Sequence, residues 1–468
     1  MKTQKIVFFL LLSFLSITIT AQSNAQYFIG YWKGAINLAQ NTKVEILLQV
    51  TQPNGKIQTK LSSSRGLTGL LVKDVQATGN HFQFAIKAYA VGYKGKLTKD
   101  QKTIKGIWQQ AGQKLPLNFR KITANEAFFT RKQTPRPPFP YRVQEVTYTN
   151  PTDNLTLSGT LTLPQGDGKF PVVILLTVAG PNNRDQAFAG HKPYAVIADY
   201  LARKGIAVLR SDDRGVGKSQ GNLFQSTIAN FAEDTQAAIA FLKKQPQIDA
   251  QRIYLLGNSE GGAVAAVTAA QNPTVAGIIL LAAPGISTQQ IILKQGENLG
   301  KTLKYTPKQI AIIQQKGKEL FQIIATGKNN PKARKKIKAL LKKYKDAPSL
   351  PNYFAKTEDE AIDMYLSPWY RYQLDFDPSA VFQKVKCPVL ALNGSLDRVI
   401  MPKENLQAIH QALVKADNSD ITIRQIPGLN HIFQTAKTGS PLEYGSLEES
   451  FSPKALKIIY QWLEGQLY

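Results

Sequence analysis

Two kinds of hydrophobic pattern divide the chain. From Tyr27 to Ile122, short runs of alternating apolar and polar residues are separated by turn residues, as in V-E-I-L-L-Q-V before P-N-G and T-I-K-G-I-W-Q-Q before A-G-Q. Alternation with a period of two, broken by frequent turns, is typical of antiparallel strands. The pattern predicts a small all-β domain over residues 27–122, either a barrel or a sandwich.

After this region comes a linker, residues 123–140, whose T-R-K-Q-T-P-R-P-P-F-P segment is too rich in proline for a helix or a central strand. From Tyr141 a hairpin-like pair leads into buried apolar runs that alternate with helical patterns. This alternation predicts a mostly parallel sheet with helices on both faces over residues 141–468. The predicted buried strands are P-V-V-I-L-L-T-V, I-A-V-L-R, R-I-Y-L-L, A-G-I-I-L-L-A, P-V-L-A-L-N and I-T-I-R-Q-I.

An insert of helical periodicity, about residues 286–363, separates the fourth of these strands from the fifth, and we expect it to form a cap. Its segment P-K-A-R-K-K-I-K-A-L-L-K-K-Y-K carries one apolar side, formed by Ile337, Leu340, Leu341 and Tyr344.

The N-terminus has the form of a secretory signal peptide, which we place at residues 1–25. Lys2 and Lys5 precede an apolar stretch that is too short to span a bilayer, and small residues allow cleavage after Ala21 or Ala25. We therefore expect an exported protein, periplasmic or secreted, with no integral membrane segment after processing.

Charge is unevenly distributed in a chain of net charge +26. Residues 27–122 hold 15 Lys and Arg against 3 Asp and Glu, residues 286–345 hold 15 against 2, and the remainder is close to neutral. The basic segments are either solvated surfaces or sites of weak association with anionic envelope surfaces. They lack the interleaved aromatic residues of nucleic-acid binding, which we exclude. The single cysteine, Cys387, lies in an apolar run and is expected to be buried rather than reactive.

The strongest chemical signal is Gly257-Asn258-Ser259-Glu260-Gly261, which follows an apolar run and leads into small, helix-compatible residues. This is the sequence form of a strand–turn–helix nucleophile elbow, in which a strained turn exposes the serine hydroxyl. A second G-x-S-x-G, around Ser219, lacks that context and is interpreted as a turn. The same segment, R-G-V-G-K-S, resembles a phosphate-binding loop but has Asp212 and Gln220 where the two forms of that loop need glycine.

A serine nucleophile needs a base and an acid that orients it. Among the four histidines, His431 in P-G-L-N-H-I-F lies just beyond the last strand, whereas His81, His191 and His410 have structural contexts. Asp397 in L-N-G-S-L-D follows the strand P-V-L-A-L, whereas Asp417 and Asp420 lie in a polar linker. The order Ser259, Asp397, His431 is the order in which α/β-hydrolases carry serine, acid and histidine.

The transition state also needs two donors for its oxyanion. One is expected to be the backbone amide of Glu260, directly after the serine. The other should come from T-V-A-G-P-N-N-R-D, with the Ala179 amide as first choice and Val178 as the alternative.

The ordered motifs G-P-N-N-R-D, R-S-D-D-R-G-V-G-K-S, G-N-S-E-G-G, S-P-W-Y-R-Y, L-N-G-S-L-D and L-N-H-I-F resemble the α/β-hydrolase superfamily. Within it they are similar to bacterial carboxylesterases of the Est10-like group, related to the serine aminopeptidase and dienelactone hydrolase branches. The resemblance covers about residues 141–468 and implies that Ser259, Asp397 and His431 are nucleophile, acid and base. The chain departs from its relatives at Thr177-Val178-Ala179, where they often have Ser-Gly-Ser or His-Gly-Ser.

These features predict an exported serine hydrolase that cleaves small-molecule carboxylic esters through an acyl-enzyme, without a metal or cofactor. Two alternatives remain: a serine peptidase of the aminopeptidase type on the same fold, and a binding protein that keeps a hydrolase shell without turnover.

Overall fold

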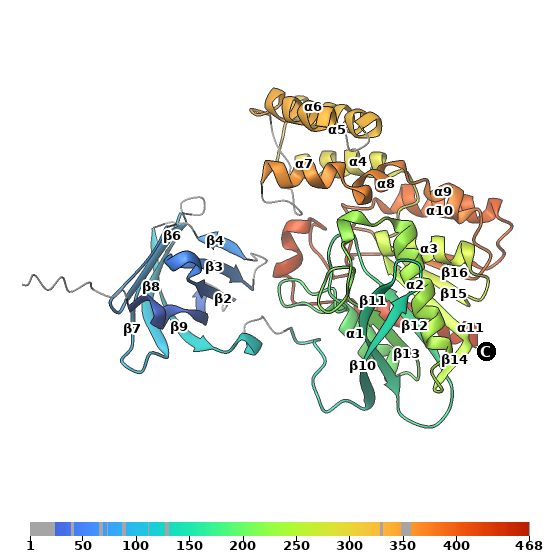
Figure 1. The fold of residues 1–468 in the computed structure, drawn as a ribbon, viewed down its shortest axis with the longest axis horizontal. Coiled ribbons are helices and arrows are strands. Elements are labelled where there is room, and N and C mark those ends of the chain that lie inside the picture. Colours follow the sequence, from blue (N-terminus) through green and yellow to red (C-terminus); the bar gives the residue numbers. More distant parts are fainter. Residues whose placement is uncertain are drawn as a thin grey trace, which may run out of the picture. The chain divides into compact units, whose positions relative to one another are not determined.

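The computed structural model describes residues 24–38, 42–64, 69–72, 74–86, 90–110, 112–126, 131–327, 331–347 and 357–467. The chain forms two compact units, residues 1–63 with 68–127 (the β unit) and residues 64–67 with 128–468 (the α/β unit). Figure 1 shows both units. Most of the expected signal peptide, residues 1–23, lies outside the described residues. Within the described residues, no helix combines the length and the hydropathy that crossing a bilayer requires.

The β unit is one antiparallel sheet whose strands follow the order β4-β3-β2-β1-β9-β8-β7-β6-β5. β4 and β5 are separated by a single residue in the chain, yet they lie at opposite edges of the sheet. The sheet must therefore curl until its two edges approach each other, which gives a barrel-like form rather than a sandwich of two sheets. The strands are β1 (Gly30–Leu38), β2 (Thr42–Thr51), β3 (Gln58–Ser63), β4 (Leu70–Val72), β5 (Asp74–Thr78), β6 (His81–Ile86), β7 (Val91–Leu97), β8 (Thr103–Gln110) and β9 (Gln113–Ile122).

Aromatic side chains fill the inside of the β unit. Trp32 is fully buried, and its Nε1 donates a hydrogen bond to the Phe28 carbonyl at 2.7 Å. Phe28 stacks on Phe82 with 5.2 Å between ring centroids, and Tyr93 meets Phe119 edge-on at 5.0 Å. A barrel filled in this way is a packed core.

The α/β unit contains an eight-stranded sheet in the order β10-β11-β13-β12-β14-β15-β16-β17. β10 and β11 form the expected antiparallel hairpin, β11 pairs with β13 antiparallel, and every other pairing is parallel. The prediction of a mostly parallel sheet is confirmed. The strands are β10 (Tyr141–Asn150), β11 (Leu155–Pro164), β12 (Phe170–Leu176), β13 (Ala207–Ser211), β14 (Ile248–Asn258), β15 (Gly277–Leu281), β16 (Val389–Gly394) and β17 (Ile421–Ile426).

Helices cover both faces of this sheet, as the sequence predicts (Figure 1). Successive residues of β12 alternate between two buried clusters, Val172 and Ile174 in one and Val173 and Leu175 in the other. The first cluster includes residues of α2 (Ile228–Lys243), α3 (Glu260–Gln271) and α10 (Pro402–Lys415), and the second includes residues of α1 (Pro193–Ala202) and α11 (Pro453–Leu467). Strand alternation therefore supplies two core layers, one on each side of the sheet.

The insertion between β15 and β16 is helical, as expected, and forms a cap with a core of its own. The expected end of the cap at residue 363 falls inside α7, and the insertion continues to α9. Its helices are α4 (Thr288–Thr302), α5 (Pro307–Gly327), α6 (Pro331–Lys343), α7 (Glu358–Leu366), α8 (Pro368–Asp375) and α9 (Pro378–Phe382). In α6, Ile337 and Leu340 are buried in the cap core, while Leu341 and Tyr344 pack against it.

The end of the linker is anchored on the α/β unit. Arg131 is buried, and its Nη2 donates hydrogen bonds to the carbonyls of Ala189 at 2.9 Å and Gly445 at 2.6 Å. Gln133 Oε1 accepts from the amides of Ser450 and Phe451. The described residues also include the short 3-10 helices η1 (Asn24–Phe28), η2 (Pro53–Gly55), η4 (Ala124–Glu126), η5 (Leu223–Gln225) and η6 (Pro441–Ser446).

Candidate active site

Ser259 lies in a strained turn between β14 and α3. Its backbone angles, φ 55° and ψ −118°, are outside the regions that residues with a side chain normally adopt. Its amide donates to the carbonyl of Leu281 at the end of β15, which fixes the turn at the carboxyl edge of the sheet. The turn exposes the hydroxyl, because Ser259 is partly accessible while Asn258 and Glu260 on either side are buried.

Two glycines make this turn possible. A Cβ at Gly257 would lie 2.0 Å from the carbonyl oxygen of Gly261, and a Cβ at Gly261 would lie 2.2 Å from the carbonyl oxygen of Leu176. Neither contact is tolerable, and both partners are backbone atoms that cannot move aside. The G-x-S-x-G pattern is thus a steric requirement of the close approach between β14, α3 and the end of β12.

Asp397 and His431 meet at the same edge of the sheet. Asp397 follows β16 and His431 follows β17, and these parallel strands are neighbours. His431 Nδ1 lies 2.9 Å from Asp397 Oδ2. The carboxylate accepts a hydrogen bond from Nδ1–H, so this contact assigns the Nδ1–H tautomer and leaves Nε2 as the basic nitrogen. Among the described residues, no group bonds to Nε2.

The loop that carries His431 is held by its own side chains. Asn430 is buried, and its Oδ1 accepts from the amides of Ile432 at 3.2 Å and Gln434 at 2.9 Å. Gln434 Nε2 in turn donates to the carbonyls of Tyr444 and Glu449. The histidine ring is therefore mounted on an ordered loop.

Ser259 is on the same edge as Asp397 and His431, since β14, β15, β16 and β17 are adjacent parallel strands. Asn258 is in register with Leu281, and Leu281 with Leu392. Within the described part of the chain, Ser259 Oγ makes no hydrogen bond, to His431 or to any other group. Such contacts are often long without substrate and shorten when it binds.

The three other histidines and the serine of the second G-x-S-x-G lie in structural or exposed positions. His191 is fully buried, with Nδ1 2.9 Å from Ser450 Oγ, and burial lowers its pKa to about 3. His81 and His410 are exposed. Ser219 is buried in a turn, where its hydroxyl donates to the Asp212 carbonyl at 2.8 Å and accepts from the Ser158 amide at 3.0 Å.

The other candidate acids, Asp417 and Asp420, and the single thiol, Cys387, lie in positions that give them no catalytic role. Asp417 is exposed, and Asp420 Oδ2 accepts from Gln466. Burial raises the pKa of the Cys387 thiol to about 12, which leaves it inert. No group of three or more His, Cys, Asp or Glu side chains in the described ranges is placed to hold a metal ion.

The loop after β12 carries the two amides considered for the second oxyanion donor, those of Ala179 and Val178. The Val178 amide donates to Gln186 Oε1 at 3.3 Å, whereas the Ala179 amide has no acceptor among the described residues. The Glu260 amide, at the first position of α3, likewise has none in the described part of the chain. An unpaired amide is what an oxyanion requires, so the geometry favours Ala179 over Val178.

Comparison with known proteins gives three findings. Residues 191–356 match the family model described as serine aminopeptidase, S33. The esterase EstD of Thermotoga maritima is 25% identical over 274 residues, which are 58% of this chain and 61% of EstD. The chain thus spans about three fifths of that relative's length. Similar solved structures include the α/β hydrolase GrgF from Penicillium sp. sh18 (19% identity, TM-score 0.43, 69% of this chain and 98% of that chain) and an esterase of Pyrococcus furiosus (16%, 0.44, 70% and 92%).

The α/β unit has the α/β-hydrolase fold that the sequence predicts, a mostly parallel sheet covered by helices with a helical insertion between β15 and β16. The matched family segment contains the nucleophile elbow, while Asp397 and His431 lie beyond it. The order Ser259, Asp397, His431 along the chain is the order of serine, acid and histidine in enzymes with this fold.

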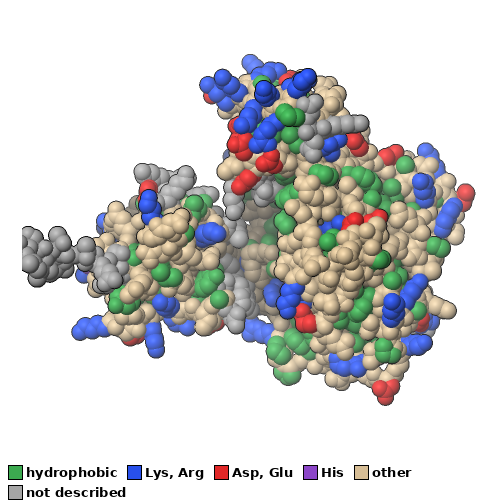
Figure 2. Space-filling view, in the orientation of Figure 1, with side chains coloured by type: hydrophobic (Ala, Val, Ile, Leu, Met, Phe, Trp, Pro, Cys, Tyr) green, Lys and Arg blue, Asp and Glu red, His purple; other side chains and the backbone are tan. Residues whose placement is uncertain are grey.

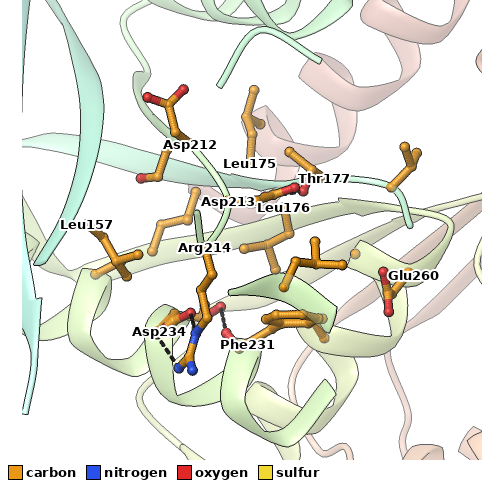
Figure 3. Close-up of a pocket in the computed structure, with 18 of the residues that line it drawn as sticks. Leu157, Leu175, Leu176, Thr177, Asp212, Asp213, Arg214, Phe231, Asp234 and Glu260 are labelled. Carbon is orange, nitrogen blue, oxygen red and sulfur yellow. Dashed lines mark hydrogen bonds and ion pairs between the residues drawn. The ribbon is translucent and has the colours of Figure 1, made fainter. Parts of the chain in front are cut away.

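A cavity of about 80 Å³ lies beside the elbow of the hydrolase domain (Figure 3). Its lining includes Glu260 and Gly261 but not Ser259, so it borders the nucleophile from the side of α2 and α3. In Figure 3, Arg214 pairs with Asp234 on one side, and Glu260 lies apart from that pair.

The side chain of Glu260 joins the elbow to the cap, a contact that the sequence does not reveal. Glu260 is buried, and its Oε1 accepts hydrogen bonds from Trp369 Nε1 at 2.8 Å and from Gln373 Nε2, both on α8. Burial and the nearby Asp213 carboxyl raise the pKa of Glu260 to about 8, against the lowering effect of the Trp369 hydrogen bond. Ala179 packs against the cluster of Leu223, Met364 and Trp369, so residues on both sides of the elbow contact a cluster that includes the cap.

Proposed function

We propose that this protein is an exported serine esterase that hydrolyses small carboxylic esters through an acyl-enzyme formed on Ser259. The matched family model and the esterase relative support hydrolase chemistry. The reaction type, the residue roles and the export are the proposal.

In the first half of the reaction, Ser259 Oγ attacks the ester carbonyl carbon while His431 Nε2 takes the hydroxyl proton. The carbonyl oxygen becomes an oxyanion that accepts hydrogen bonds from the amides of Glu260 and Ala179. Asp397 stabilises the imidazolium. As the tetrahedral intermediate collapses, the C–O bond to the alcohol breaks and His431 returns the proton to the leaving oxygen.

In the second half, His431 takes a proton from water, and the hydroxide attacks the acyl carbon bound to Ser259. Collapse of the second intermediate releases the carboxylic acid, and the proton returns to Ser259 Oγ. Every proton is passed through one imidazole, so the sequence requires no other acid or base.

One observation carries the proposal: an imidazole bonded to a buried carboxylate at 2.9 Å, at the sheet edge where a serine is held in a strained turn. Strain of this kind costs stability and persists where the surrounding structure imposes it, typically at a reactive site. The bonded pair also argues against a binding protein that keeps the hydrolase fold without turnover, because such a protein has no chemical use for the pair.

A fluorophosphonate probe tests the nucleophile. We expect the mature protein to be labelled at Ser259 and to hydrolyse p-nitrophenyl esters. Ser259→Ala should abolish labelling and lower kcat by about 10⁴–10⁶-fold. Peptide mass spectrometry of the labelled protein identifies the modified residue.

The second G-x-S-x-G provides a matched control. Ser219→Ala removes a buried hydroxyl and two hydrogen bonds, so it should lower stability by about 1–3 kcal/mol while labelling continues. Labelling that persists in Ser259→Ala and is lost in Ser219→Ala would overturn the assignment.

A serine peptidase is the second candidate, because the matched family model is described as serine aminopeptidase. Glu358 and Glu360 are exposed at the start of α7, where Glu360 completes a capping box with Thr357, and neither lines the cavity. Comparing kcat/KM for p-nitrophenyl esters with that for aminoacyl anilides separates the two. A preference for the anilides would replace the esterase proposal.

Export is proposed from the N-terminal sequence, and the β unit bears on where cleavage occurs. Ala25 is 3% exposed and Phe28 fully buried in η1, so cleavage after Ala21 leaves this folded segment whole, whereas cleavage after Ala25 removes a packed methyl group. Mass spectrometry of the mature N-terminus should give a chain that starts at Gln22. A full-length N-terminus on the exported protein would argue for an uncleaved anchor.

A further inference from the structure

The loop from Thr177 to Asp185 carries the Ala179 amide, and packing alone does not hold it. Thr177, Val178 and Gly180 line the cavity of about 80 Å³ beside the elbow (Figure 3). A loop that borders unfilled space lacks van der Waals partners on that side and can shift into it. An amide that must meet an oxyanion within a few tenths of an ångström therefore needs another restraint.

That restraint comes from Asp213, which directly follows Asp212 at the end of β13. Its Oδ1 accepts from Thr177 Oγ1 at 2.6 Å, and its Oδ2 accepts from the Asn182 amide at 2.8 Å. The Asp213 amide also donates to the Asn182 carbonyl at 3.1 Å. One carboxyl group thus bonds to the loop on both sides of Ala179.

The residues around Ala179 are fixed in turn. Asn182 Nδ2 donates to the carbonyls of Val178 at 2.8 Å and Gly180 at 2.6 Å. Gln186 receives the Val178 amide and contacts Asn258 Oδ1 at 3.5 Å, which ties the loop to the residue before the nucleophile. These bonds hold the chain on both sides of Ala179, whose own amide has no acceptor among the described residues.

Keeping this carboxyl inside the protein costs stability. Within the described residues no Lys or Arg pairs with Asp213, whereas the adjacent Asp212 pairs with Arg184 at 2.7 Å. Burial raises the pKa of Asp213 to about 7, against the lowering effect of its hydrogen bonds from Thr177 and Asn182. A carboxyl group that is shielded from water and not paired with a cation is unfavourable unless its hydrogen bonds compensate.

We propose that Asp213 is a positioning residue of the oxyanion hole: through Thr177 and Asn182 it sets the Ala179 amide for the transition state. The inference rests on the proposed function. It also accounts for a loop that presents Thr177-Val178-Ala179 without glycine, since side-chain hydrogen bonds replace the tight glycine turn as the source of order.

Asp213→Ala and Asp213→Asn in the full chain test the proposal. Asp213→Ala removes both acceptors and should lower kcat for a p-nitrophenyl ester by about 10–100-fold, with KM within about twofold, because the oxyanion exists only in the transition state. The second-order rate constant for fluorophosphonate labelling should fall in parallel. Asp213→Asn should recover most of both, because its amide can accept from Asn182 and donate to the Thr177 hydroxyl.

Asn418→Ala is the matched control. Asn418 is buried at the opposite, amino edge of the sheet, where its Nδ2 donates to the carbonyls of Val385 and Cys387. It should lose thermal stability with kcat and labelling rate unchanged. Should Asp213→Ala fail to fold, Thr177→Val removes one of the two restraints and should lower the labelling rate about fivefold.

The outcomes separate the two claims. A folded Asp213→Ala whose kcat and labelling rate stay within twofold of the parent, a loss confined to KM, or an equal loss in Asn418→Ala overturns the positioning role, while the Ser259→Ala result still stands for the esterase. A parent protein that is not labelled at Ser259 overturns the proposed function and this inference with it.

Discussion

At the scale of single residues, Asp397 shows how a carboxylate is committed to one partner. Its side chain is fully buried, and its Oδ1 accepts from the amides of Val399 at 2.7 Å and Ile400 at 2.9 Å. Only Oδ2 remains for His431. The acid therefore has one orientation, and the imidazole that it bonds to has one tautomer.

Asp397→Asn should lower kcat about 10³–10⁴-fold with little change in KM, because an amide that donates to Nδ1 reverses the tautomer and removes the base. Steady-state kinetics on the p-nitrophenyl ester measure the loss, and circular dichroism checks the fold.

Asp417→Asn is the control for this substitution. Asp417 is exposed with φ 54°, a conformation that asparagine adopts readily, so activity should be unchanged. If both variants lose activity equally, or if neither does, Asp397 is not the acid.

At the scale of elements, the elbow depends on three backbones that meet: the end of β12, the end of β14 and the start of α3. Gly261, on the first turn of α3, faces the carbonyls of Leu176 and Thr177 and joins α3 to the end of β12. The same contact brings the loop after β12, which carries the Ala179 amide, beside Ser259. The close approach of these backbones therefore sets both the turn at Ser259 and the position of that loop.

Gly261→Ala should therefore destabilise the hydrolase domain by about 3 kcal/mol or more and remove activity, since its Cβ would overlap backbone. Thermal melting followed by circular dichroism measures the effect.

Gly465→Ala is the matched change within α11, where an added Cβ meets nothing within 4 Å. It should raise stability by about 0.5–1 kcal/mol. A melting temperature for Gly261→Ala close to that of the parent would show that the elbow has more room than its glycines indicate.

At the scale of the whole molecule, buried carboxyl groups couple stability to pH. Glu260, bonded to Trp369 and Gln373 and close to Asp213, has its pKa raised from 4.5 to about 8. Between these values the folded state holds a proton that the unfolded chain has lost. Stability therefore falls as pH rises through this window and levels off above about 8.

Glu260→Gln should flatten the fall in stability between pH 7 and 8.5. The pKa of Asp213 is raised from 3.8 to about 7, so most of its effect on stability falls below pH 7. Burial lowers the pKa of His191 from 6.5 to about 3, so its contribution to stability is fully present above pH 6.5 and does not change in this range. Melting temperatures of parent and variant across this range, at constant ionic strength, give the comparison. Equal slopes would mean that Glu260 is already ionised at neutral pH.

The basic surface of the cap is the other feature at this scale. Lys and Arg side chains gather over α6 in Figure 2, and Arg334 and Lys338 pair with acids of α7. Because the apolar face of α6 is used in the cap core, only its charged face is available to an anionic envelope surface. Such association stays a prediction, and turnover in the presence of anionic vesicles should lose its salt dependence if the surface has no role.

Much of the fold could be predicted because hydrophobic periodicity and the residues that flank each element depend only on neighbours along the chain. The six buried runs became the six strands β12 to β17, and the glycines of the elbow follow from sterics within a few residues. Ser259, Asp397 and His431 could be predicted to lie at one edge because each lies at or a few residues beyond the end of a strand, and parallel strands end at one edge. Asp213 could have been noticed too, as half of an acidic pair that directly follows a buried strand.

The sequence by itself determined the strand–helix alternation, the strained turn and the residue types available for chemistry, because these depend on neighbours along the chain. Only the tertiary structure decided that Asp213 bonds to a loop 36 positions away and that Glu260 receives Trp369 from the cap. The same holds for the choice between Ala179 and Val178, which depended on where Gln186 lies. Hydrogen bonds between distant segments form only when packing brings those segments together, and no period or spacing encodes which ones will meet.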